Sequence, residues 1–164
     1  MHAIRSLLIG AIFITSAIME PVVVHADTTG GGVVTIRPDA AITTRQGLPN
    51  FVGISGDNTG AKGISMNLVV IPAGAAAKPH LHRGYETAIY ILKGRVRTRY
   101  GEGLCQSVVN EAGDFVFIPA DVPHQPVNLS TTEEARAIVA RTDPNEQESV
   151  ELYNRPTIHA DCDP

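Results

Sequence analysis

Three histidines and one glutamate stand at a spacing that favours metal binding. His80, His82 and Glu86 lie in the segment KPHLHRGYETAIYILKG, and His124 follows in IPADVPHQPVN. Positions 80, 82 and 86 share parity, so in extended backbone their side chains can point the same way. His124, on a separate strand folded over the same space, would complete a set of four ligands. Imidazole and carboxylate suit Fe, Mn, Ni, Cu or Zn, and the lack of nearby cysteine argues against a closed structural zinc site.

The sequence predicts that short strands position these residues. Runs such as ISMNLVVI, ETAIYILK, DFVFIP and ARAIVART are bounded by Gly, Pro, Asn or Asp, and VVTIR at 33–37 reads as a first strand. Fifteen glycines and eleven prolines favour many turns. Short, evenly spaced strands predict an all-β sandwich or barrel of antiparallel strands. Helix is expected only near TTEEAR and around NEQESVELY in the tail.

Alternation along two strands indicates which faces are solvated. In RVRTR, residues 95–99, the three arginines share one face, which we interpret as a solvated outer face. In DFVFIP, Phe115 and Phe117 alternate with Val116 and Ile118. One of these two pairs must face the interior, and the pattern alone leaves both choices open.

The two histidine segments resemble the two motifs of the cupin family. The first segment resembles G-x5-H-x-H-x3,4-E-x6-G, and the second resembles G-x5-P-x-G-x2-H-x3-N. The matching positions are Gly74, His80, His82, Glu86 and Gly94 in the first motif, and Gly113, Pro119, His124 and Asn128 in the second. The motifs come in the family's order, 18 residues apart. The resemblance implies a single-domain double-stranded β-helix, or jelly-roll barrel, with a metal held at its centre by three histidines and one glutamate.

Two positions depart from the family pattern. Seven residues rather than six separate Glu86 from Gly94, so either a bulge interrupts the strand or Thr87 takes the usual glutamate place. We favour Glu86 with a bulge, because threonine is a poor ligand and parity selects position 86. Asp121 stands where the family often has glycine, and aspartate tolerates positive φ better than most residues. Asn128 opens the sequon NLS, but we interpret it as a turn or packing residue.

The N-terminal residues have the layout of a secretory signal peptide. A positive start in MHAIR precedes the uncharged run SLLIGAIFITSAIM, and VHA before Asp27 fits a cleavage site. A run of 14 residues is short for a span, which needs about 20 apolar residues. We therefore expect a signal peptide at 1–26, a barrel at 27–143 and a C-terminal tail at 144–164. The mature protein is expected to be secreted or periplasmic and free of the membrane after cleavage.

Export would give the two cysteines a structural role. Cys105 and Cys162 both survive cleavage at Asp27, and an oxidising compartment permits a disulfide between them. A bridge would close a loop of 56 residues and stabilise the fold by about 2–4 kcal/mol. Two unrelated thiols are the alternative. Neither cysteine belongs to a CxxC pair, which argues against thiol redox catalysis.

The net charge of the chain and its expected metal ligands together limit the classes of function that it can have. A net charge of −4 argues against nucleic-acid binding, since phosphate contacts need a basic surface. The resemblance implies oxidative metal chemistry, so we expect a metal-dependent oxidoreductase of the dioxygenase or oxalate type acting on a small oxygenated organic molecule. A metal-assisted sugar isomerase or epimerase, and a non-catalytic small-molecule-binding cupin, are the alternatives. A homodimer paired through a sheet edge, with VVTIR as the available strand, is the expected assembly.

Overall fold

Strands make up nearly all the regular structure of this computed structural model, which describes residues 32–145 and 149–154. The strands are β1 (Ile42–Thr43), β2 (Pro49–Ile54), β3 (Ser65–Ile71), β4 (His80–His82), β5 (Thr87–Lys93), β6 (Arg95–Tyr100), β7 (Gln106–Glu111), β8 (Phe115–Ile118), β9 (His124–Asn128), β10 (Ala135–Arg141) and β11 (Val150–Leu152). Two short helical turns join them, α1 (Gly56–Thr59) and η1 (Glu102–Leu104). Among the described residues no helix is long and apolar enough to cross a membrane.

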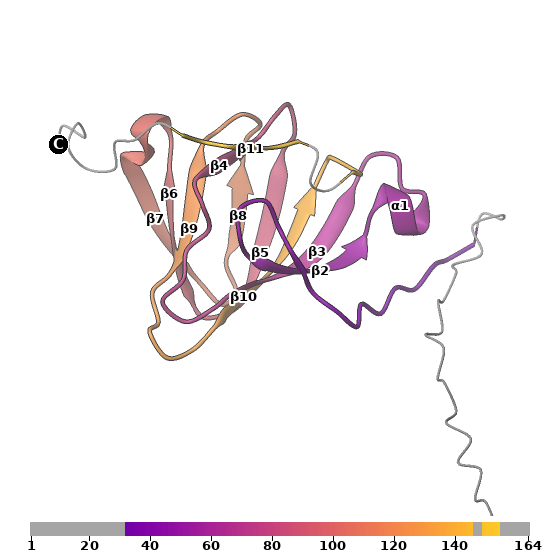
Figure 1. Ribbon diagram of the computed structural model, residues 1–164, viewed down its shortest axis with the longest axis horizontal. Helices are drawn as coiled ribbons and strands as arrows, with labels where there is room; N and C mark the ends of the chain where they lie inside the picture. The colour runs from indigo at the N-terminus through magenta and orange to yellow at the C-terminus, as the bar shows by residue number, and fades with distance from the viewer. Residues whose placement is uncertain (1–31, 146–148, 155–164) are drawn as a thin grey trace, which may run out of the picture.

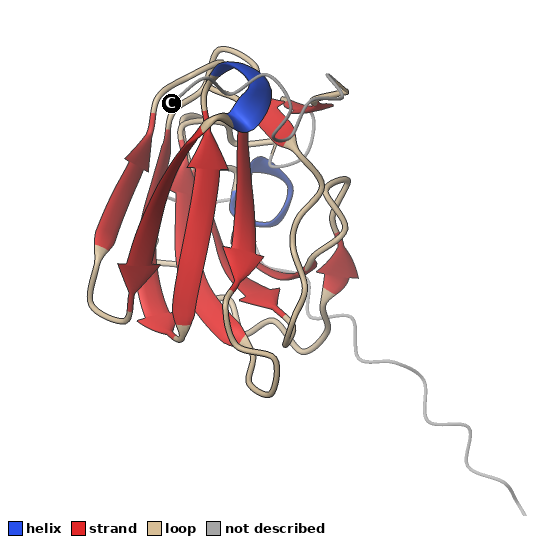
Figure 2. Cartoon of the chain, turned by 90° about the vertical axis from the view of Figure 1, so that its left-hand side faces the viewer, coloured by secondary structure: helices blue, strands red, loops and turns tan. Residues whose placement is uncertain are grey.

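The strands form two antiparallel sheets around a common interior (Figure 1, Figure 2). One sheet has six strands in the order β1-β2-β3-β10-β5-β8, and the other has five in the order β11-β4-β9-β6-β7. Neighbours in space are mostly distant in sequence, as β10 between β3 and β5 shows. This arrangement confirms the predicted all-β jelly-roll barrel.

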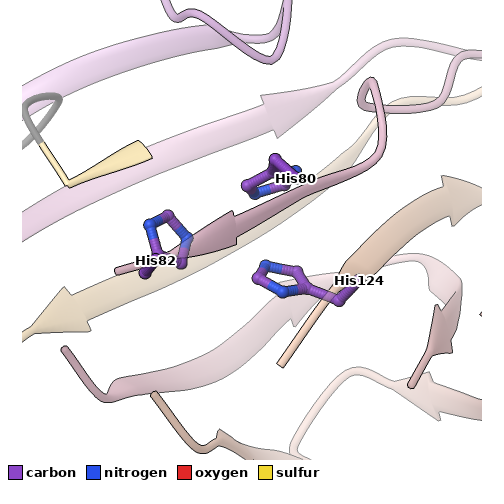
Figure 3. A group of neighbouring side chains, drawn as sticks. All are labelled: His80, His82 and His124. Carbon is purple, nitrogen blue, oxygen red and sulfur yellow. The ribbon is translucent and has the colours of Figure 1, made fainter. Parts of the chain in front are cut away.

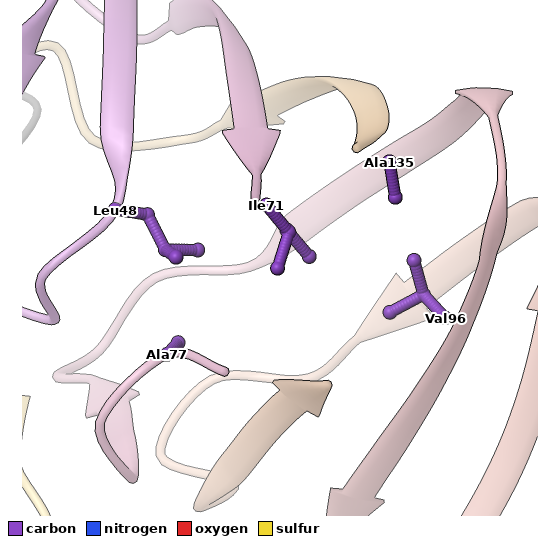
Figure 4. Close-up of a cluster of buried hydrophobic side chains, with 5 residues drawn as sticks. All are labelled: Leu48, Ile71, Ala77, Val96 and Ala135. Atoms are coloured by element: carbon purple, nitrogen blue, oxygen red, sulfur yellow. The ribbon is translucent and has the colours of Figure 1, made fainter. Parts of the chain in front are cut away.

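A small apolar cluster includes buried side chains from both sheets (Figure 4). It consists of Leu48, Ile71, Ala77, Val96 and Ala135. Gly94, between β5 and β6, packs against this cluster at φ 88°, a conformation that L-residues rarely adopt. A Cβ at position 94 would lie 2.9 Å from the Ala135 Cβ. The hairpin that carries the last glycine of the first motif therefore requires glycine on both steric and backbone grounds.

Asp121 links the two histidine-bearing segments. It has φ 63°, as the sequence led us to expect for a residue in the family's glycine position. Its carboxylate Oδ1 accepts hydrogen bonds from the Gly84 backbone N–H at 3.1 Å and from Arg83 Nη1 at 3.0 Å. The turn after β4 is thereby tied to the loop that leads into β9.

The two ends of the described chain differ from expectation. Residues 33–37 form no strand, and the segment that contains them leads away from the barrel in Figure 1. High β-propensity is insufficient there because no neighbouring strand pairs with it. In the tail, the predicted helix is replaced by β11, in which Val150 pairs with His82 and Leu152 with His80. The open edge of β4 thus determines the conformation of residues 150–152.

Several sequence-based expectations fall outside the described residues. The signal peptide at 1–26 and the beginning of the barrel at 27 are among them. Cys105 is described but Cys162 is not, so the bridge between them stays a prediction.

Candidate metal centre

The structure brings His80, His82 and His124 together inside the barrel (Figure 3). The first two come from β4 and the third from β9, where it is the direct cross-strand partner of His80. Each side chain is only 3% exposed, and their ligand atoms lie within 4.8 Å of one another. The ring centroids of His80 and His124 are 4.3 Å apart. Three imidazoles at such distances can share one ion.

Backbone carbonyls fix the tautomers of two of these imidazoles. His80 Nδ1 lies 2.8 Å from the Lys78 carbonyl oxygen, and His124 Nδ1 lies 2.9 Å from that of Val122. A carbonyl oxygen only accepts, so each Nδ1 carries the hydrogen and each Nε2 keeps a lone pair for a metal. Such hydrogen bonds are the usual outer support of a ligating histidine. His82 Nδ1 is buried without a hydrogen-bond partner in the described structure.

The surroundings keep all three imidazoles neutral. Burial lowers the pKa of His80 to about 3, with His124 and Arg141 adding to the shift. Burial also lowers the pKa of His124 to about 4, and Arg141 contributes there too. For His82, burial and then the Arg141 charge lower the pKa further still. A neutral imidazole is the form that binds a metal, so this set of donors fits a transition-metal ion.

These shifts predict that the metal-free protein loses stability as the pH falls. An unfolded histidine has a pKa of about 6.5, so below that pH the unfolded chain binds protons that the folded chain refuses. The contribution of the three histidines to the free energy of unfolding should be fully present above about pH 6.5. It should decline as the pH falls toward 4, by roughly a few kcal/mol. Urea denaturation with chelator present, at pH steps between 7 and 4, measures this loss. A His124→Gln variant should show a shallower decline between pH 6.5 and 5, and a flat profile for the unaltered protein there would contradict the prediction.

Glu86 is not brought to the three histidines. Its side chain is exposed, whereas Thr87 is only 2% exposed and lines the same cavity as the histidines. Parity can be counted only along continuous extended backbone, and a turn at Arg83–Gly84, with Gly84 at φ 73°, separates β4 from β5. The bulge predicted between Glu86 and Gly94 is present, as a register shift in β5 between Ile91 and Lys93, but it does not bring Glu86 to the histidines. The alternative that places Thr87 in the family's glutamate position describes this structure.

Arg141 is a site residue that the sequence reading missed. It is 6% exposed, lines the histidine cavity, and its Nε donates to Thr87 Oγ1 at 3.4 Å. Its position on β10 shares parity with Ala135, Ala137 and Val139. In the sequence, the sign of this residue was a strand face of small and apolar side chains that ends in an arginine.

The interior continues from the histidines into an apolar region. Two neighbouring cavities of about 60 Å³ each share Leu48, Val69, Ile89, Thr98, Pro126 and Val139 in their walls. Val116 and Ile118 face these cavities, while Phe115 and Phe117 face outward. This settles the choice that the alternation in β8 had left open. Any small molecule at the metal centre would meet a polar end and mostly apolar walls.

Comparison with known proteins agrees with this geometry. Residues 67–141, which contain all three histidines, match the family model described as the cupin domain. These residues form a cupin domain. No curated protein matches this sequence.

Several solved structures resemble this cupin domain in fold. An oxalate decarboxylase from Lactobacillus farciminis, solved as a formate complex, has a TM-score of 0.59 and 20% identity over 70% of this chain. A Bacillus subtilis oxalate decarboxylase, studied for its Mn(II) centres, has a TM-score of 0.58 and 19% identity over 70% of this chain. The alignments cover 33% and 30% of those proteins, so this chain spans about a third of their length. Similarity at this identity establishes the shared fold alone.

Proposed function

We propose that this cupin domain binds one divalent transition metal and works as a metal-dependent oxidoreductase on a small oxygenated organic molecule. The observation that carries the proposal is the convergence of three buried, neutral imidazoles at the polar end of the barrel interior. His80, His82 and His124 would hold the ion, while Fe, Mn, Ni, Cu and Zn all accept imidazole ligands.

Three protein ligands leave three positions open on a six-coordinate ion. When bound, the metal would supply a Lewis acid and, if it is redox-active, a route for electrons between substrate and oxidant. The chain's own residues orient the imidazoles through Lys78 and Val122, and its apolar walls limit the entry of water. With the ion bound, a substrate would have room to bind through two oxygen atoms beside a second small molecule.

Arg141 and Thr87 favour a substrate with an oxygen that carries negative charge. The guanidinium of Arg141 and the hydroxyl of Thr87 line the histidine cavity, where they can donate hydrogen bonds. A carboxylate or enolate would match the positive charge of the guanidinium. The fold-level likeness to oxalate decarboxylases supports this substrate class without specifying the reaction.

We place this activity outside the cytoplasm, in a secreted or periplasmic protein. The support is the signal-peptide pattern of residues 1–26, with its positive start, short apolar run and small-residue cleavage site. N-terminal sequencing of the protein recovered from the producing cells would show whether it begins near Asp27.

Metal analysis followed by turnover assays tests the function. The purified protein should contain about one equivalent of a transition metal, and oxygen uptake with small carboxylates or enolisable carbonyl compounds should depend on it. Failure to retain or take up any of the five candidate metals would contradict the proposed centre. Metal-dependent turnover that persists without oxygen would favour the isomerase, and metal and ligand binding without turnover would favour a binding protein.

A further inference from the structure

A buried glutamine lines the histidine cavity with an amide oxygen that has no partner. Gln46 is 7% exposed and belongs to the wall of the cavity that contains the three histidines. Its Oε1 is buried and accepts no hydrogen bond from any described residue. A buried acceptor without a partner costs free energy, which a bound molecule recovers by donating a hydrogen bond to it. The Gln46 amide is therefore a candidate for contact with a ligand of this cavity.

Backbone hydrogen bonds fix Gln46 relative to one of the histidines. It lies in the turn from β1 to β2, where the Thr44 N–H donates to the Leu48 carbonyl oxygen at 3.0 Å and the Leu48 N–H donates to Thr44 Oγ1 at 3.1 Å. The Gln46 carbonyl oxygen accepts from the Lys78 N–H at 2.8 Å. The Lys78 carbonyl oxygen in turn accepts from His80 Nδ1. Lys78 thus positions both residues, and such preorganisation favours binding.

A neutral hydroxyl is the group that best complements the Gln46 amide. The same wall contains the Arg141 guanidinium, and the cavity would also hold a divalent ion, so an ammonium donor would be repelled by like charge. A carboxylate only accepts, so it would leave the amide oxygen of Gln46 without a donor. A hydroxyl both donates and accepts, and it therefore satisfies the amide in either rotation about its terminal bond.

The rest of such a ligand must be small and apolar. Gln46 lines the histidine cavity but not the neighbouring one, whose walls include Ile71, Ile91 and Val96. A hydroxyl at Gln46 therefore leaves the remainder of the molecule to the apolar cavity. Each cavity has a volume of about 60 Å³, and since a water-sized atom needs about 10–15 Å³, the two together hold about eight non-hydrogen atoms.

We propose that Gln46 recognises a hydroxyl group of the substrate, and that the substrate is a small hydroxy acid with a short alkyl chain. This inference rests on the proposed function, in which the metal ion and Arg141 bind the acid group. Oxalate has neither a hydroxyl nor an alkyl chain, so it would leave both the Gln46 oxygen and the apolar cavity without a partner.

Isothermal titration calorimetry tests this recognition on the Zn²⁺-loaded protein produced from the full-length chain. The ligands are butanoate, 2-hydroxybutanoate and 3-hydroxybutanoate, and the measured quantity is the preference for the tighter hydroxy acid over butanoate. The wild type should show a preference of at least about tenfold, and Gln46→Met should lose about tenfold of it. Chelation of the metal by the hydroxyl contributes equally in both proteins, so it cancels in the comparison.

Thermal unfolding without metal or ligand separates recognition from support of the fold. Gln46→Met should unfold at the wild-type temperature or up to about 3 °C above it, because it removes a buried acceptor that has no partner. Gln125→Met is the matched control, since Gln125 lines neither cavity and its Nε2 donates to the Ala77 carbonyl oxygen at 3.0 Å. It should lower the midpoint by about 5 °C and leave the hydroxyl preference unchanged.

These measurements distinguish failure of the hydroxyl recognition from failure of the metal centre. A wild type that takes up Zn²⁺ but binds none of the three acids, or shows only the preference of Gln46→Met, would overturn the recognition and leave the metal centre intact. A midpoint more than about 5 °C lower in Gln46→Met would also overturn it, because the amide would then support the fold. A wild type that takes up no metal would refute the proposed function, and with it the inference that rests on it.

Discussion

Replacing His124 with alanine is expected to weaken metal binding by about 100-fold or more. The change removes one of three ligands from a buried site, and even changes to residues that only support ligands cost about 10–100-fold. No other described carboxylate, thiolate or imidazole lies in the group that could take its place. Competition titration against a chelator of known affinity, with Zn²⁺ or Co²⁺ as the probe, measures the loss.

Two variants in β5 and the turn before it make this test specific. Glu86→Gln should leave metal affinity within about twofold of the wild type, because the Glu86 side chain is exposed and outside the histidine group. Thr87→Glu should strengthen binding by about tenfold or more, because it places a carboxylate where a buried side chain already faces the histidines. If Glu86→Gln weakened binding as much as His124→Ala, residue 86 would be a ligand, and the strand would have another register.

Replacing Asn128 with alanine is expected to destabilise the fold by about 3 kcal/mol. Asn128 is 4% exposed, and its Nδ2 donates to the carbonyl oxygens of Ile71 at 3.0 Å, Pro72 at 3.2 Å and Glu133 at 2.7 Å. Its Oδ1 accepts from the Ser130 backbone N–H at 3.0 Å. Alanine would leave these backbone groups without their partner in a buried place. Thermal unfolding should show a midpoint lower by about 10 °C.

A matched control separates this effect from the general loss of an amide. Asn110→Ala, on β7, removes an asparagine whose Oδ1 has no hydrogen-bond partner in the described structure, and should cost less than about 1 kcal/mol. Metal affinity per folded molecule should be unchanged in both variants. Equal destabilisation by the two substitutions would mean that the network around Asn128 contributes little. The interpretation of Asn128 as a turn and packing residue agrees with its contacts.

The three-histidine cluster was predictable because its spacing rules are local. His80 and His82 lie on one three-residue strand, where alternation holds, and the second motif places His124 on a partner strand. The motif glycines also have a local cause, as Gly94 shows at φ 88°. Such features need only the backbone geometry of a few neighbouring residues.

The fourth ligand position could not be predicted in the same way. Choosing between Glu86 and Thr87 required counting through a turn, and the turn at Arg83–Gly84 interrupts the alternation. Arg141 depends on a contact with Thr87 across 54 positions in the chain, which no local pattern records. The strand at 150–152 likewise exists because β4 offers an edge, and residues 33–37 lack such a partner.

The place of β11 beside β4 has a consequence for the order of assembly. The strand that carries His80 and His82 shares a single residue pair with β9 and is flanked on its other side by residues 150–152. Contacts between segments so distant in sequence form late, because closing long loops costs entropy before the contacts compensate. Residues 150–152 must therefore be synthesised before β4 has both neighbours. A nascent chain that still lacks residues 150–152 leaves one edge of the histidine-bearing strand without its partner, so we expect full metal affinity only after these residues have been added.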